Sequence, residues 1–225
     1  SMIAEDLKPN RLEAAKAVGT EFLSSRPNDN IGLVIFAGES YTLCPLTTDK
    51  KTLVNLMGTI KDGMMDNDGT AIGMGLANAV NRLKDSQAKS KVIILLTDGT
   101  NNRGEIDPLT ASELAKAYGI RVYTIGVGTK GEAPYPVQTI FGIQKQMVPV
   151  EIDEETLGAI AEKTGGHYFR ATNNNSLKAI YNDIDKMEKT KIKVTVHTSK
   201  NEEYFPYAIA ALVLLLLEIL LRNTI

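Results

Sequence analysis

Asp98 and Thr70 carry oxygen atoms at the kind of position where an α/β protein binds ligands. Asp98 follows the apolar run 92–96 and Thr97, and Gly99 comes directly after it. A continuous β-branched and aliphatic run that ends in a turn signal predicts a strand buried on both faces of a parallel sheet. In open α/β sheets ligands lie beyond the carboxyl ends of the strands, and Asp98 falls at such an end. Thr70 stands at the start of a segment with a strong helical apolar stripe.

The start of the chain, Ser1-Met2, points to the same edge of the sheet, so two hydroxyls and one carboxylate are expected there. Hydroxyl and carboxylate oxygens suit a hard divalent cation such as Mg²⁺. A purely structural interpretation stands beside this one. Asp-Gly is a common turn pair, an aspartate at position 98 can cap a helix, and Thr70 is well placed to be an N-cap residue.

The composition limits the class of protein. The 225 residues suffice for one α/β domain with an appendage, and 25 basic against 27 acidic residues give a net charge of −2. This balance argues against nucleic acid as a partner, because a basic face is then expected. Cys44 is the only cysteine, which excludes an internal disulfide framework and a cysteine-based zinc cluster. His167 and His197 lack metal-ligand spacing and are interpreted as ordinary strand residues.

Apolar runs and helical stripes alternate along the chain. The pattern predicts strands at 31–36, 41–46, 92–96, 120–127, 167–171 and 192–198, and helices that begin near residues 10, 52, 70, 107, 153 and 173. The loop from Gly128 to Val150 is rich in glycine and proline and has room for a small hairpin. Alternation of strand and helix predicts an α/β fold, a doubly wound, mostly parallel sheet with helices on both faces.

The end of the chain differs in kind. Residues 205–221 form a 17-residue apolar window with a single charge, Glu218, and aromatic residues stand at one end and Arg222 at the other. A buried helix is the alternative, but the segment is apolar on all sides and follows a polar linker. We therefore expect a domain at 1–199, a linker at 200–206 and a transmembrane helix at 207–222. Arg222 on the cytoplasmic side would place the domain outside.

Several long blocks resemble a known family, the von Willebrand factor type A domain, and more closely the bacterial Bat (Bacteroides aerotolerance) membrane proteins. The family's metal-ion-dependent adhesion site reads D-x-S-x-S after the first strand, a Thr in a second loop and an Asp after a later strand. The blocks that carry the resemblance are SMIAEDLKPNRLEAAK, GLVIFAGESYTLCPLT, DGTAIGMGLANAVNRLKDS, KVIILLTDGTNNRGEIDP, RVYTIGVGT, the APYPVQT loop and the apolar tail.

The resemblance implies that Ser1, Thr70 and Asp98 bind the metal, which is Mg²⁺ in this expectation, or Mn²⁺ or Ca²⁺. Ser1 matches the last serine of D-x-S-x-S, whereas the preceding Asp and Ser and the first strand are absent. We therefore expect an N-terminally truncated form of such a protein. Two consequences are predicted: unpaired strand edges beside the missing strand, which invite self-association, and a weakened or unoccupied metal site.

The function implied is a membrane-anchored interaction module of the bacterial inner membrane, with its domain on the periplasmic side. Its partners would be sister Bat proteins and a MoxR-type AAA+ ATPase, in an aerotolerance or stress-related complex. A metal-independent scaffold is the alternative. Enzymes are less favoured: a haloacid-dehalogenase phosphatase would need an aspartate where Leu96 stands, and no Rossmann or P-loop fingerprint is present.

Overall fold

The computed structural model describes residues 1–65, 67–140 and 142–195, together with residues 207, 209 and 215. The chain divides into a unit Ser1–Glu188 and a unit Lys189–Ile225. The elements are α1 (Arg11–Ser24), β1 (Ile31–Phe36), β2 (Ser40–Thr47), α2 (Lys50–Thr59), α3 (Ile72–Leu83), β3 (Lys91–Thr97), α4 (Pro108–Ala117), β4 (Ile120–Val127), β5 (Glu132–Thr139), β6 (Gly142–Pro149), α5 (Glu154–Thr164), β7 (Tyr168–Ala171) and α6 (Asn174–Thr195).

A parallel sheet of order β3-β4-β7 forms the centre of the first unit. Strand β3 pairs with β4 in unbroken register from Lys91 opposite Ile120 to Thr97 opposite Gly126. Because parallel strands end at one edge, this register sets Asp98 at the carboxyl edge of the sheet. The predicted α/β fold with a mostly parallel sheet is confirmed.

Strands β1 and β2 form a separate antiparallel pair. Within the described residues β1 pairs only with β2 and β3 only with β4, so β1 and β3 each have one edge without a strand partner. All six residues of β1 are half-buried. The strand predicted at 31–36 is confirmed, but it is not fully buried, as its continuous apolar run would suggest, because a strand with one neighbour is covered less completely than a strand inside a sheet.

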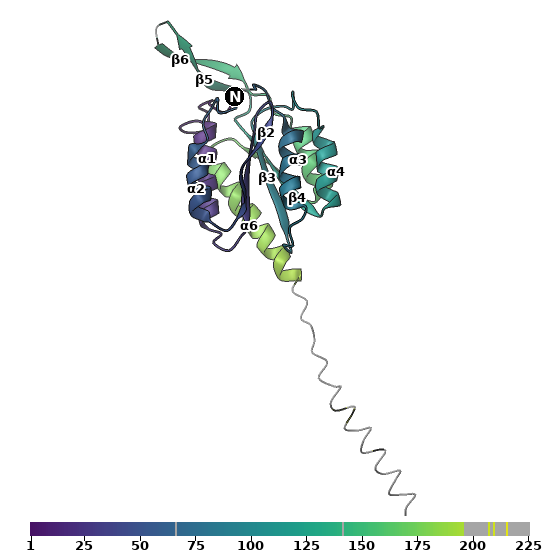
Figure 1. Ribbon diagram of the computed structural model, residues 1–225. Coiled ribbons are helices and arrows are strands. Elements are labelled where there is room, and N and C mark those ends of the chain that lie inside the picture. Colours follow the sequence, from purple (N-terminus) through teal and green to yellow (C-terminus); the bar gives the residue numbers. More distant parts are fainter. Residues whose placement is uncertain (66, 141, 196–206, 208, 210–214, 216–225) are drawn as a thin grey trace, which may run out of the picture. The chain divides into compact units, whose positions relative to one another are not determined.

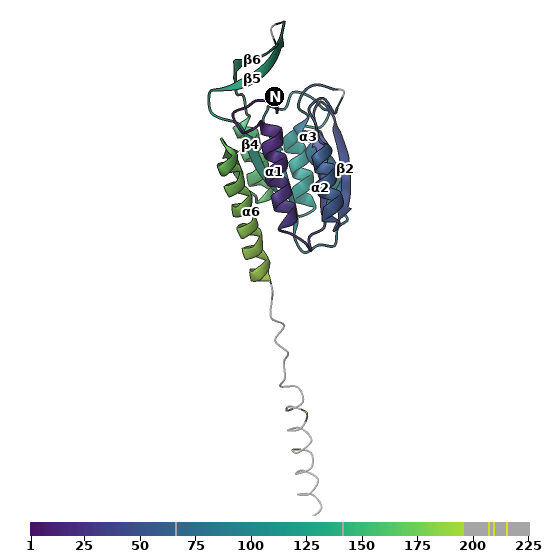
Figure 2. The same cartoon turned by 90° about the vertical axis from the view of Figure 1, so that its left-hand side faces the viewer.

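Helices cover both faces of the parallel sheet, with α3 and α4 on one side and α1 and α6 on the other (Figures 1 and 2). Strand β4 supplies both cores, because successive side chains of a strand point to opposite faces. Val122 packs in the cluster with Leu76, whereas its neighbour Tyr123 packs in the cluster with Leu177. A third, smaller cluster lies between α1, α2 and the β1–β2 pair: Leu23, Cys44, Leu53 and Met57.

Side-chain caps explain where four helices begin. The side chains of Asn10, Asp49, Asp107 and Asp153 each accept a hydrogen bond from the backbone N–H three residues further on. These bonds satisfy amide groups that the first turn of a helix leaves without a partner. Helix α3 lacks such a cap: its N-cap residue is Ala71.

Strands β5 and β6 form an antiparallel hairpin within the loop 128–150, as the sequence allowed. The hairpin extends away from the helix and sheet layers, at the end of the unit where the chain starts (Figures 1 and 2). It exposes three large apolar side chains: Ile140, Ile143 and Met147.

Helix α6 continues to Thr195, so the strand predicted at 192–198 is wrong for residues 192–195. The alternation of apolar and polar residues there resembles a strand, but a helix satisfies its own backbone groups without a neighbour. Residues 196–206 lie outside the described part, as does most of the predicted transmembrane segment 207–222. In the described residues we find no helix with the length and apolar character needed to cross a membrane.

Candidate functional site

Ser1, Thr70 and Asp98 line one cavity of about 300 Å³ at the carboxyl edge of the parallel sheet. The hydroxyl of Ser1 donates a hydrogen bond of 2.6 Å to Oδ1 of Asp98, across 97 positions of sequence. Thr70 lies against Gly99: a Cβ at Gly99 would come 3.1 Å from the Thr70 hydroxyl oxygen. The three predicted residues therefore come together from three distant segments of the chain.

Asp98 is buried, with 6 % of its surface exposed, directly after the last residue of β3. It does not cap a helix, because the next helix, α4, is capped by Asp107. Instead both oxygens of Asp98 accept hydrogen bonds, Oδ1 from Ser1 and Oδ2 from Arg11. The Asp98 carboxylate therefore joins the start of the chain and α1 to the end of β3, and its role is more than that of a turn residue.

Thr70 lies two residues before α3 and is not its N-cap residue, so the capping interpretation is wrong. The loop that follows Asp98 fixes its backbone. The Thr70 N–H donates to Oδ1 of Asn102 at 2.8 Å, and the Thr70 carbonyl accepts from the backbone N–H groups of Asn102 and Arg103 at 3.0 and 3.3 Å. These bonds tie the two loops together at the mouth of the cavity.

Arg11 is the residue of the site that sequence reasoning missed. Its guanidinium, 3 % exposed, donates through Nη1 to Oδ2 of Asp98 at 3.0 Å. Through Nε and Nη2 it also forms a bidentate pair with Asp6, at 2.7 and 2.6 Å. One buried cation thus serves two buried carboxylates. A possible sequence signal was an arginine in the first turn of α1, where the helix dipole disfavours a cation unless an anion lies nearby.

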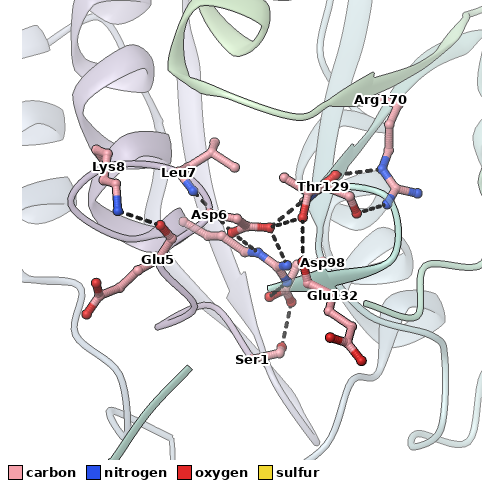
Figure 3. A network of polar contacts seen from close by, with 11 residues as sticks. Ser1, Glu5, Asp6, Leu7, Lys8, Asp98, Thr129, Glu132 and Arg170 are labelled. Atoms are coloured by element: carbon pink, nitrogen blue, oxygen red, sulfur yellow. Dashed lines mark hydrogen bonds and ion pairs between the residues drawn. The ribbon is translucent and has the colours of Figure 1, made fainter. Parts of the chain in front are cut away.

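Asp6 joins the site to the start of the β5–β6 hairpin. Beside the pair with Arg11, its carboxylate accepts hydrogen bonds from the N–H groups of Leu7 and Thr129 at 3.1 and 2.9 Å (Figure 3). Burial alone would raise the pKa of Asp6, but the bonds from Arg11 and Thr129 outweigh it and lower the pKa to about 2. The carbonyl of Thr129 in turn accepts from Arg170 at 2.6 Å.

The hairpin forms the apolar wall of the same cavity, through Tyr135, Val148 and Pro149. The cavity therefore has an oxygen-rich side, which carries Ser1 and Asp98, and an apolar side. A ligand with a polar group next to an apolar one matches this lining.

Two hydroxyls and one carboxylate agree in type with a hard divalent cation. The number of charged donors is small: in the described residues no group of three or more His, Cys, Asp or Glu side chains is placed to hold a metal ion. Asp98 already has Arg11 as a counter-ion. The residues thus fit a divalent cation in kind, and we expect them to bind it weakly.

Comparison with known proteins gives consistent results. The family model of the von Willebrand factor type A domain matches residues 1–183. An uncharacterized protein of Borreliella burgdorferi is 32 % identical over 209 residues, which cover 92 % of this chain but only 61 % of that protein. The chain thus spans about three fifths of the length of that relative.

Two solved structures are similar as well. The protein BatB of Bacteroides thetaiotaomicron is 31 % identical, with a TM-score of 0.73 and coverage of 84 % of this chain and 94 % of the other. An aerotolerance-related membrane protein of Bacteroides fragilis is 29 % identical, with a TM-score of 0.71 and coverage of 83 % and 94 %.

Proposed function

Because the chain belongs to the von Willebrand factor type A domain family, with Bat proteins among its relatives, we propose that it binds an acidic group of a partner protein at the cavity of Ser1, Thr70 and Asp98. One observation carries the proposal: these three residues, chosen from the sequence, line a single cavity at the carboxyl edge of the sheet. That edge is where α/β sheets bind ligands.

In this proposal Mg²⁺, Mn²⁺ or Ca²⁺ is held by the hydroxyls of Ser1 and Thr70 and by the carboxylate of Asp98. When bound, the cation offers an open coordination position to a carboxylate of the partner. Arg11 keeps Asp98 oriented through its bond to Oδ2. The site needs no group that attacks a substrate, and the protein acts as an interaction module and not as an enzyme.

The partners that we propose are sister Bat proteins and a MoxR-type AAA+ ATPase system. The segment 207–222 would anchor the chain in the bacterial inner membrane, with the domain on the periplasmic side. Support comes from the Bacteroides fragilis relative, which is described as a membrane protein, and from the apolar sequence of the segment.

A metal-independent scaffold is the second candidate function, and the pair of Arg11 and Asp98 favours it. The guanidinium, 3.0 Å from Asp98, already supplies the positive charge that a cation would bring. In that case the partner meets the apolar wall of the cavity without a metal.

Calorimetric titration with MgCl₂ and MnCl₂ distinguishes the two functions. We compare the full chain in mild detergent with a version in which a strand and the sequence Asp-x-Ser-x precede Ser1. We expect weak binding in the first and stronger binding in the second, lost in Asp98→Asn. Asp85→Asn, which changes an exposed aspartate, is the matched control and keeps the binding. Equal binding with and without the Asp98 carboxylate would refute the metal site, and no binding in any version would favour the scaffold.

A further inference from the structure

Glu151 is a second acidic residue in the lining of the cavity that Asp98 lines. It lies in the short segment between β6 and α5, next to the apolar wall that includes Val148 and Pro149. Asp98 is the only other lining residue with a carboxylate. The cavity therefore has one carboxylate on the side of the sheet and one on the side of the hairpin.

The side chain of Glu151 has no partner in the described part of the chain. It is exposed, and it takes part in no hydrogen bond and no ion pair with the described residues. Three acidic side chains of the surrounding segments each have a cationic partner: Glu5 pairs with Lys145, Asp6 with Arg11 and Glu154 with Arg170. The Glu151 carboxylate is thus available to a ligand that enters the cavity.

The buried charges beside the cavity favour a second carboxylate once a cation is bound. Asp6 and Asp98 carry two negative charges and Arg11 carries one positive charge, so the group has a net charge of −1. A divalent cation beside Asp98 adds two positive charges and leaves +1. Because an uncompensated charge is costly where water is partly excluded, a further carboxylate stabilises the loaded site. Glu151 can supply this charge from the wall of the cavity.

We propose that Glu151 is a further ligand of the cation, which fills the open coordination position until the acidic group of the partner replaces it. This inference rests on the proposed function, because it needs a cation at Asp98. Hard divalent cations take about six oxygen ligands, and Ser1, Thr70 and Asp98 provide only part of such a set. Glu151 lies outside the strands and helices, so its exchange for the partner's carboxylate requires no rearrangement of the sheet.

Titration of the full chain in mild detergent with MnCl₂, followed by the electron paramagnetic resonance of the free ion, measures the affinity. Glu151→Gln keeps the size of the side chain and removes its charge, and we expect it to weaken Mn²⁺ binding about tenfold. Glu132→Gln is the matched control. Glu132 is exposed at the base of the same hairpin, opposite Pro149, but it does not line the cavity. This control measures long-range attraction alone, and the affinity should stay close to that of the parent.

The relaxation of water protons by bound Mn²⁺ reports how many water molecules the ion keeps, a number that long-range attraction between charges does not change. Glu151→Ala vacates the position that we assign to the carboxylate, so the bound ion should keep more water than in the parent. Sodium acetate is the probe that stands for the acidic group of the partner. We expect acetate to lower the water number of Glu151→Ala to that of the parent, and to leave the parent unchanged.

The proposal is overturned if Glu151→Gln binds Mn²⁺ as tightly as the parent, or if Glu132→Gln weakens binding to the same extent. An equal water number in Glu151→Ala and the parent overturns it as well. Asp98→Asn then decides about the cation site itself. Loss of binding in that variant keeps the proposed function while the role of Glu151 falls. Unchanged binding in Asp98→Asn, or no binding in the parent, removes both.

Discussion

Replacing Arg11 by methionine tests the electrostatic core of the site. The substitution keeps the length and apolar stem of the side chain and removes the cation shared by Asp6 and Asp98, whose side chains are 2 % and 5 % exposed. Removing one member of a buried ion pair typically costs 3–5 kcal/mol, because the remaining charge stays buried without compensation. We expect a loss of about 3–5 kcal/mol in the free energy of unfolding at pH 7.

The cost should depend on pH, and its sign follows from Asp6. In the parent the pKa of Asp6 is lowered to about 2, so its stabilisation is complete above the ordinary value near 4 and is lost as pH falls toward 2. That contribution is about 2–3 kcal/mol. Without Arg11, the largest of the influences that lower the pKa of Asp6 is lost, while burial still raises it, so the pKa of Asp6 is higher in the variant than in the parent. The variant therefore loses less stability than the parent as Asp6 takes up a proton, so the difference between variant and parent shrinks from pH 7 to pH 3.

Urea unfolding of the full chain in mild detergent, followed by circular dichroism at pH 7, 5 and 3, measures both effects. Lys178→Met is the control, because its pair with Glu21 is more than half exposed on both sides and should contribute less than about 1 kcal/mol. A loss below 1 kcal/mol for Arg11→Met, or a loss that is the same at all three pH values, would refute the reasoning.

The remaining predictions concern packing and one buried carboxylate. Gly73→Ala would place a Cβ 1.9 Å from the carbonyl oxygen of Ile106, and we expect a loss of about 3 kcal/mol in urea unfolding. In Gly158→Ala the added Cβ would have no atom within 4 Å, and alanine favours the helix more than glycine, so we expect the free energy of unfolding to rise by about 0.5–1 kcal/mol. A fall in the free energy of unfolding would contradict this reasoning. Tyr123→Phe removes the hydroxyl that donates to Glu188 at 2.6 Å, and we expect thermal unfolding to show a free energy of unfolding lower by about 1–2 kcal/mol. An unchanged free energy of unfolding would mean that water takes the place of the hydroxyl.

Local patterns predicted much of this candidate site because two of its residues stand at strand and helix boundaries. The run 92–96 is apolar throughout, which identifies a parallel strand and fixes the edge where Asp98 lies. The prediction that this strand is buried on both faces is wrong: only alternate residues of β3 are buried, and the others are half-buried. Thr70 was found in the same way, from the helix that follows. Ser1 was expected at the same edge, and only the resemblance to the family implied its role as a metal ligand.

Arg11 escaped prediction because its role depends on a contact across 87 positions of sequence. A charged residue in the first turn of a helix is normally solvated. Asp6 lies only five residues before Arg11, but nothing in the sequence indicates that both side chains are buried beside Asp98. The strand predicted near Ile192 failed for a related reason. Alternating residues describe a strand only where a neighbouring strand is available, and that is a property of the fold.

Pro134 and Pro136 limit how strands can be added to the β5–β6 hairpin. A hairpin with two open edges can add a strand on each side, and such addition continues without limit toward a fibre. The prolines block addition on the β5 side, because they offer no N–H group and the Pro134 carbonyl already accepts a hydrogen bond of 2.8 Å from the N–H of Glu5. Another strand can therefore pair with this hairpin only at β6, and repeated addition on both sides is prevented.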